Sequence, residues 1–119
     1  MKYEMIYPKT FLGCCDVLGI EDTISRGVKG YKSNLLDTFQ KLLICLDAYW
    51  KIAGEEMGLD KPWKPDWNDK KQDKHGFYNE IKNTIINSKV FVFPTAKMRD
   101  VFYENFKNLI KECKIKSLY

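Results

Sequence analysis

The sequence is poor in the residues from which most catalytic and metal sites are built. It contains one histidine, so any histidine-dependent nucleophilic site would have to use His75. Its four cysteines, none of them in a CxxC pair, are Cys14, Cys15, Cys45 and Cys113. Neighbouring cysteines point in different directions on a helix, which argues against a zinc site. All four occupy apolar positions of helical patterns, which favours buried thiols in a reducing cytoplasm over a disulfide framework.

Long apolar runs and phosphate-binding loops are also missing. The longest apolar run, residues 42–46, is far too short to cross a bilayer, and residues 1–4 lack the apolar core of a signal peptide. Gly27 and Gly30 have neither the spacing nor the preceding strand of a phosphate-binding loop. We therefore expect a cytoplasmic protein with no membrane anchor, no metal and no cofactor.

What is present is an ordinary globular composition with many aromatic residues. The 119 residues are 45% hydrophobic and 14% aromatic, which predicts one folded domain spanning residues 1–119. The charge is uneven, because residues 1–60 carry a net −2 and residues 61–119 a net +6. A basic C-terminal half suggests an acidic partner such as nucleic acid. Acids lie between its lysines, however, and Arg99 is its only arginine, unlike a dedicated phosphate-binding face.

Helical patterns dominate the first half of the chain. The spacing of apolar residues predicts a short helix over residues 10–18 and a long central helix over residues 35–57. A glycine and then a hydrophobic residue follow each of them, at Gly19 and at Gly58, which is typical of a helix that ends in a left-handed cap. The apolar stripe of the long helix consists of Leu35, Phe39, Leu42, Leu46, Tyr49, Ala53 and Met57. Residues 21–32 read as a loop, with an extended pair around Val28.

The second half predicts a small sheet followed by a helix. Residues 76–93 are rich in β-branched and aromatic side chains, and residues 90–93 predict a strand that Pro94 ends. Residues 76–88 fit either strand or helix, and we favour a short antiparallel β-meander. Thr95 then caps a C-terminal helix that packs on the sheet and reaches Cys113. The predicted fold class is therefore α+β.

Residues 61–69 form the most informative segment, because they hold two tryptophans and two prolines between the long helix and the sheet. The prolines exclude regular structure, while the tryptophans favour burial. The segment therefore either covers the protein's own core or binds a partner. We favour an internal clasp in which both tryptophans lie over Tyr49, Trp50 and the sheet. The residues expected to bind a partner are Trp63, Pro65, Asp66, Trp67 and Asp69.

Three chemical alternatives depend on residues in and after this segment. The start of a calcium loop is resembled by the oxygen-bearing side chains of Asp66, Asn68 and Asp69. Later positions, however, carry lysines and a phenylalanine where such a loop has oxygen ligands and a glycine. A small hydrolase would use Asp66 or Asp69 with His75, and needs them within hydrogen-bond reach. A nucleic-acid-binding module would stack bases on Tyr78, Phe91 and Phe93, although such strand aromatics are more often core.

Two segments also carry a resemblance. Residues 47–63, DAYWKIAGEEMGLDKPW, and residues 93–107, with FPT, MRD and YENFK, resemble small uncharacterised proteins that phages, prophages and related mobile elements of gut bacteria encode. The resemblance implies a phage or mobile-element setting, in which small proteins that bind, assemble or regulate are common. With no catalytic signature in the chain, we predict a non-catalytic interaction or assembly protein, not an enzyme, that acts on a protein partner or as a homo-oligomer.

Overall fold

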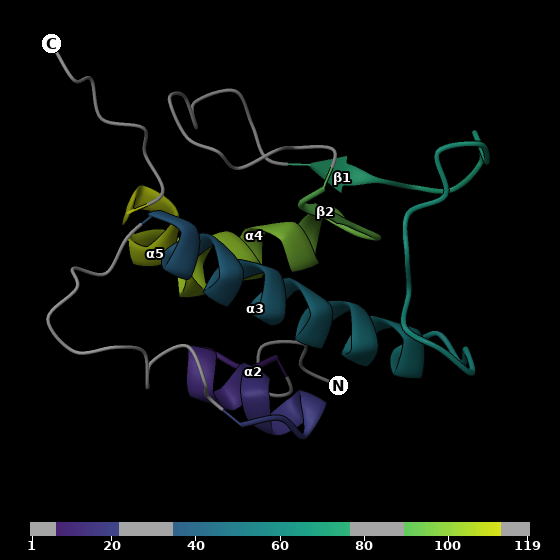
Figure 1. Cartoon of the computed structure of the whole chain (residues 1–119). Coiled ribbons are helices and arrows are strands. Elements are labelled where there is room, and N and C mark those ends of the chain that lie inside the picture. The colour runs from purple at the N-terminus through teal and green to yellow at the C-terminus, as the bar shows by residue number, and fades with distance from the viewer. Residues whose placement is uncertain (1–6, 22–34, 77–89, 113–119) are drawn as a thin grey trace, which may run out of the picture.

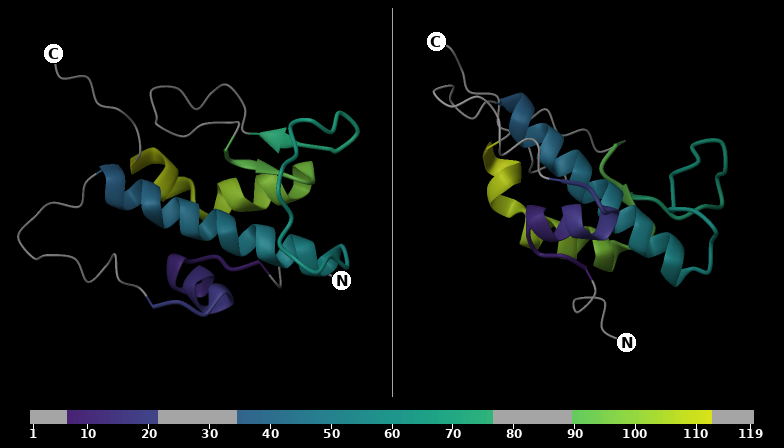
Figure 2. Two further views of the ribbon diagram at one scale, coloured as in Figure 1. Left: turned by 45° about the vertical axis from the view of Figure 1, so that its right-hand side comes forward. Right: turned by 60° about the horizontal axis from the view of Figure 1, so that its bottom comes forward.

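The long helix α3 (Leu35–Glu56) runs through the middle of the molecule (Figure 1). The structure is a computed structural model that describes residues 7–21, 35–76 and 90–112. In that part of the chain the other elements are α2 (Phe11–Leu18), β1 (His75–Gly76), β2 (Val92–Phe93), α4 (Ala96–Asn105) and α5 (Lys107–Glu112). Helix α2 packs against α3, and in the left view of Figure 2 it lies below α3 while α4, α5 and the strands lie above it. The expected mixture of helices and a small antiparallel sheet is confirmed.

Helices α2 and α3 begin and end close to their predicted bounds of 10–18 and 35–57. Thr10 caps α2, and its hydroxyl oxygen accepts a hydrogen bond from an amide of the first turn at 3.0 Å. Gly19 and Gly58 follow the two helices with φ angles of 69° and 76°, in the left-handed region that glycine adopts without strain. The backbone amide of the residue after each glycine donates a hydrogen bond to the helix carbonyl five residues earlier. The glycine-plus-hydrophobe pattern thus predicted both helix ends correctly.

The described strands are shorter than the sequence predicts. Strand β1 pairs antiparallel with β2, with His75 opposite Phe93 and Gly76 opposite Val92. The strand was predicted to begin at Val90, which is wrong, because β2 begins two residues later. The amide of Val92 donates to the carbonyl of Val90 at 3.0 Å, so the chain turns tightly just before the strand. Such a turn takes the two preceding residues out of the extended pairing.

Two predicted features lie outside the described residues. The extended pair around Val28 is one of them. The other is the part of the predicted β-meander that falls within residues 77–89, between β1 and β2. The choice between strand and helix for that segment therefore stays a prediction.

The predicted single C-terminal helix is two helices. Thr95 caps α4 as expected, accepting a hydrogen bond from the amide of Met98 at 3.1 Å. The helix is interrupted at Phe106, whose φ of −119° and ψ of 22° separate α4 from α5. Neither glycine nor proline marks this position. The Phe106 ring is buried, with its centroid 5.8 Å from that of Tyr49 and 4.9 Å from that of Phe102, so tertiary packing overrides the helical pattern.

Tyr49 of α3 lies at the centre of the core. Its ring centroid is 4.7 Å from that of Tyr7 and 4.9 Å from that of Phe102. Its hydroxyl donates to the carbonyl of Pro8 at 2.8 Å and accepts from the amide nitrogen of Asn105 at 3.0 Å. Burial raises the pKa of Tyr49 above its ordinary value. This one side chain ties the segment before α2 and the end of α4 to the central helix.

None of the helices described here has both the length and the apolar character to cross a membrane.

Candidate functional site

The chain leaves α3 through an irregular segment, residues 57–74, which we call the tryptophan loop. Trp63 is only 4% exposed and packs edge-on against Trp50 of α3, with ring centroids 5.8 Å apart and an interplanar angle of 72°. The Trp63 amide donates to the carbonyl of Trp50 at 3.0 Å, and the Trp50 indole N–H donates to the carbonyl of Val92 at 2.9 Å. Trp50 therefore joins both the loop and β2 to α3. The expected burial of Trp63 is confirmed.

Gly54 of α3 makes this close crossing feasible. A β-carbon at Gly54 would lie 2.9 Å from the α-carbon of Pro62 and 3.0 Å from the amide nitrogen of Trp63, and it would overlap the carbonyl oxygen of Lys61. Glycine inside a helix costs roughly 0.5–1 kcal/mol relative to alanine. The close backbone approach explains its presence here, and nothing in the helical pattern of the sequence signals that approach.

Hydrogen bonds from side chains to the backbone brace the outer part of the loop. Gln72 bridges two backbone positions, because its amide oxygen accepts from the Asp66 amide at 2.6 Å and its amide nitrogen donates to the Lys64 carbonyl at 2.9 Å. The carboxylate of Asp66 accepts from the backbone amide of Asn68 at 3.0 Å, and that of Asp69 bonds the amide two residues further along at 2.9 Å. These are local turns of the kind that Asp favours. The loop is irregular but internally fixed.

Trp67, four residues further along the loop than Trp63, has 56% of its surface exposed. The amide of Asp69 donates to the carbonyl of Asp66 at 3.1 Å, and Trp67 lies at the corner of the turn that this bond closes. The ammonium group of Lys74 lies 5.3 Å from the centroid of the Trp67 ring and donates to the Asp69 carbonyl at 2.8 Å. The prediction of an internal clasp made by both tryptophans is therefore wrong for Trp67, because more than half of its surface stays open to solvent.

An open hollow of about 800 Å³ lies in the tryptophan loop. Its apolar lining comprises Leu59, Pro62, Trp63, Pro65 and Trp67. This volume is in the range of ligand-binding pockets. Leu59 and Trp67 are both exposed, so the apolar lining is open to solvent.

Charged side chains surround this apolar surface. Lys61 and Lys64 line the hollow together with Asp66. The charge of Lys64 also reaches Asp47 of α3. Partial burial raises the pKa of the Asp47 carboxyl group, and the positive charge of Lys64 opposes that rise. The hollow thus offers an apolar surface beside two ammonium groups and one carboxylate.

Four of the five residues predicted to bind a partner meet at this hollow, namely Trp63, Pro65, Asp66 and Trp67. Asp69 is not part of its lining, because its carboxylate is turned toward the loop backbone. Sequence reasoning missed Gln72, which lines the hollow and braces it. The polar run in which Gln72 lies gave no sign of this role.

The two carboxylates of the hydrolase alternative are engaged elsewhere. Asp66 and Asp69 accept hydrogen bonds from loop amides, while the backbone of His75 pairs with that of Phe93 in the sheet. Within the described residues, no hydrogen bond links either carboxylate to His75. The structure also places no group of three or more His, Cys, Asp or Glu side chains where they could hold a metal ion, within the same residues.

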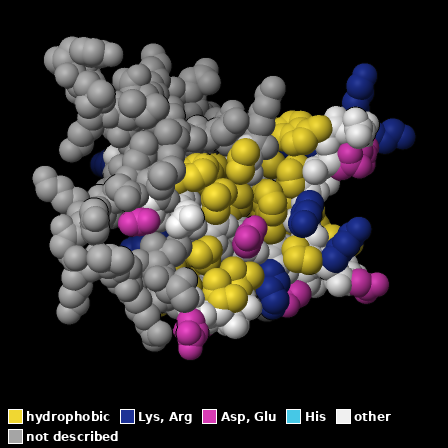
Figure 3. Space-filling view, in the orientation of Figure 1, with side chains coloured by type: hydrophobic (Ala, Val, Ile, Leu, Met, Phe, Trp, Pro, Cys, Tyr) yellow, Lys and Arg dark blue, Asp and Glu magenta, His cyan; other side chains and the backbone are white. Residues whose placement is uncertain are grey.

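The predicted base-stacking surface is not available on β2. Phe91 and Phe93 are fully buried in the core, and Tyr78 lies outside the described residues. Figure 3 shows hydrophobic side chains gathered over the middle of one face, with Lys and Asp or Glu side chains interspersed toward the end that holds the tryptophan loop. The described part of the basic half therefore shows no continuous cationic face on this side, contrary to what a phosphate-binding surface would need.

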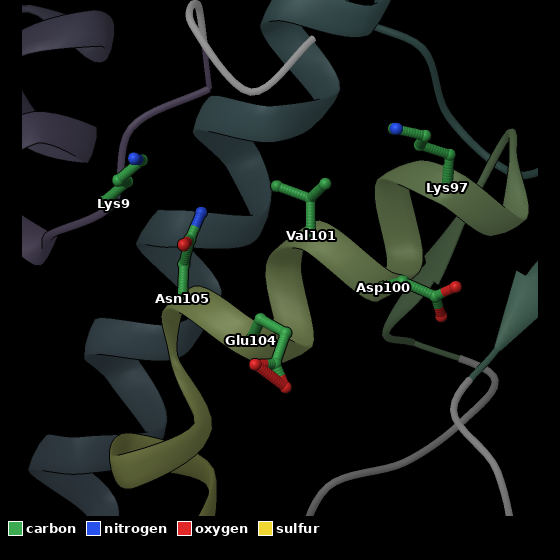
Figure 4. A pocket seen from close by; sticks show the side chains of 6 residues that line it. All are labelled: Lys9, Lys97, Asp100, Val101, Glu104 and Asn105. Atoms are coloured by element: carbon green, nitrogen blue, oxygen red, sulfur yellow. The ribbon is translucent and has the colours of Figure 1, made fainter.

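A second hollow, of about 380 Å³, lies along α4 (Figure 4). Lys9 reaches it from the segment before α2, and the α4 residues that line it are Lys97, Asp100, Val101, Glu104 and Asn105. Asp100 accepts a hydrogen bond from Arg99 at 3.0 Å, and Glu104 lies 3.5 Å from the ammonium group of Lys107. Charges of both signs are thus mixed around a small apolar floor. This hollow favours no class of ligand, and the tryptophan loop is the stronger candidate.

No protein-family model matches the chain, and comparison with curated proteins and with solved structures likewise gives no match.

Proposed function

We propose that this chain is a non-catalytic interaction protein that uses the tryptophan loop to bind an acidic, apolar segment of another protein. The observation that carries the proposal is Trp67, a large aromatic side chain that is 56% exposed on a loop held in place by its own hydrogen bonds. Exposed tryptophans are costly to keep in water and are enriched among the residues that dominate protein interfaces. A tryptophan on an ordered loop is therefore well suited to anchor a partner.

The rigidity of the loop supports this role. Trp63 fixes the inner half of the loop on α3, and Gln72 closes the outer half. A side chain presented by a preorganised loop loses less conformational entropy on binding than one presented by a flexible loop. Tryptophan adds a large contact area with only two rotatable side-chain bonds. The hollow beside Trp67 provides the concave apolar surface into which a partner's side chain would fit.

The charge distribution selects the class of partner. Lys61 and Lys64 line the hollow and favour carboxylates on the bound segment. The tryptophan loop as a whole holds five lysines and four aspartates, so a nucleic acid would bring its phosphates close to several carboxylates. A short protein segment with one apolar side chain beside Asp or Glu fits this mixture better. The resemblance in residues 47–63 and 93–107 adds the proposal that the partner belongs to a phage or mobile element.

The test is a selection of displayed random peptides on the immobilised protein, with depletion on the Trp67→Ala variant. We expect the enriched peptides to share an apolar residue flanked by acidic ones. A synthetic peptide of this consensus should bind Trp67→Ala about thirtyfold more weakly than the parent protein, as for an interface hot spot. Met57→Ala is the matched control, because Met57 is exposed on the same loop but does not line the hollow. This variant should bind normally.

Three outcomes would overturn the proposal. The first is enriched peptides that bind Trp67→Ala as tightly as the parent protein. The second is binding of a single-stranded oligonucleotide that depends on Trp67 and weakens steeply with salt, which would assign the loop to nucleic acid. The third is self-association in sedimentation that is lost in Trp67→Ala, which would make a second copy of the chain the occupant of the hollow.

A further inference from the structure

Two buried thiols meet between α2 and α3. Cys14 of α2 and Cys45 of α3 are both fully buried within one hydrophobic core cluster, on two helices that pack directly against each other, and the Cys14 thiol is near enough to raise the pKa of Cys45. Both are free thiols in this structure. Cys15 is the next residue on α2 and is also buried, but it is not part of that cluster. The proposed binding function uses none of these groups.

We propose that Cys14 and Cys45 are a redox-active pair that closes into a disulfide between α2 and α3. The oxidant is a small-molecule disulfide such as oxidised glutathione. One protein thiolate attacks the oxidant, forms a mixed disulfide and releases one glutathione thiolate. The second protein thiol loses its proton and attacks the protein sulfur of the mixed disulfide, which releases the second glutathione. Two protein thiols are thereby oxidised to one disulfide, and one glutathione disulfide is reduced to two thiols.

The surroundings of the pair control how fast this reaction proceeds. The hydrogen bond from the neighbouring thiol and burial in the core both raise the pKa of Cys45, while Lys41 opposes the rise. Because the attacking species is the thiolate, the packed pair is protected from the oxidant. Oxidation therefore requires α2 to separate transiently from α3. Once the disulfide has formed, the same burial slows its reduction, which again proceeds through the opened state.

The disulfide would act as a covalent link between the two helices. It would close a loop of roughly thirty residues, including the connection from α2 to α3, and a link of that size removes considerable freedom from the unfolded chain. For a protein of this length we expect the midpoint of thermal unfolding to rise by about 10 °C on oxidation. Addition of a dithiol reductant should reverse the rise.

The experiment is to incubate the full-length protein with oxidised glutathione and to map its disulfides by mass spectrometry of peptides cut without reduction. We expect one intramolecular bond, between the peptides that hold Cys14 and Cys45. Cys15→Ala should form it normally, whereas Cys14→Ala should stop at the mixed disulfide with glutathione. The peptide map of the parent protein assigns the bond directly, so the conclusion holds even if a core variant folds poorly.

The requirement for opening of α2 is tested separately. Thr10→Ala removes the hydroxyl that caps α2, and a lost cap of this kind should speed oxidation about fivefold. Thr95→Ala, which removes the matching cap of the distant α4, should leave the rate unchanged. A bond to Cys15 or Cys113, or only mixed disulfides in the parent protein, would overturn the proposal. An equal rate in Thr10→Ala and the parent would overturn the opening step.

Discussion

Replacing Gly54 by alanine tests how the tryptophan loop is attached to α3. The new methyl group would meet the backbone of the loop, 2.9 Å from the α-carbon of Pro62 and 3.0 Å from the amide nitrogen of Trp63. Contacts this short require a shift, and backbone atoms cannot turn aside as the end of a flexible side chain can. We therefore expect the loop to lift away from the helix in the Gly54→Ala variant.

The size of the effect follows from two opposing contributions. Alanine stabilises a helix interior by about 1 kcal/mol relative to glycine. Displacing the loop exposes the Trp63 ring and breaks the bond from its amide to the Trp50 carbonyl, and the loss of a buried tryptophan costs about 3–5 kcal/mol. The clash dominates, so the free energy of unfolding should fall by about 2–4 kcal/mol.

The assay is urea denaturation of the parent protein, Gly54→Ala, Trp63→Ala and the double variant, followed by far-ultraviolet circular dichroism. In the Trp63→Ala background the loop is already released, so Gly54→Ala should cost nothing there and should instead gain the helix-propensity term of about 1 kcal/mol. The coupling between the two substitutions should reach about 2 kcal/mol or more. An increase of about 1 kcal/mol in the stability of Gly54→Ala alone would match helix propensity without any clash, and would refute the close crossing.

Three further predictions concern the core and the helix ends. Trp63→Ala should lower the free energy of unfolding by about 3–5 kcal/mol, because it empties a buried aromatic site. Trp67→Ala should change it by no more than about 1 kcal/mol, because Trp67 is largely exposed and its contact with Lys74 is weak; chemical denaturation distinguishes these outcomes. Thr95→Ala should cost about 1 kcal/mol through the lost cap of α4, and Thr95→Ser should recover most of it in the same assay. Burial raises the pKa of Tyr49, so the unfolded chain releases this proton at a lower pH than the folded protein, and stability should fall as the pH rises above about 10. Urea titrations at about pH 8 and pH 10.5 should show a smaller fall for Tyr49→Phe than for the parent protein, and equal falls would contradict the assignment.

Features of the fold that depend on neighbouring residues could be predicted from the sequence. The helix ends at Gly19 and Gly58 and the cap at Thr95 depend on hydrogen bonds within a few residues, and all three are found as expected. The long apolar stripe of α3 likewise needs no knowledge of distant contacts. The break at Phe106 could not be predicted, because it depends on the packing of its ring against Tyr49, far away in the sequence.

The candidate site was predicted in its composition but not in its geometry. The prolines and tryptophans of residues 61–69 indicated an irregular segment that buries aromatic side chains, and Trp63 fulfils this expectation. Whether Trp67 would also be buried depended on a turn between Asp66 and Asp69 and on the bridge that Gln72 makes. Neither can be read from the sequence, because the polar groups of this segment could have formed other sets of hydrogen bonds. Hydrophobicity alone could not distinguish the buried tryptophan from the exposed one.

The bridge made by Gln72 gives the loop a modular character. The Gln72 side chain bonds the backbone at Lys64 and at Asp66, so it closes the outer part of the loop separately from the part that packs on α3. Residues between the two ends of the bridge could therefore diversify during evolution without disturbing α3 or the sheet. In protein engineering, the same segment is a place to graft new recognition sequences onto an unchanged scaffold.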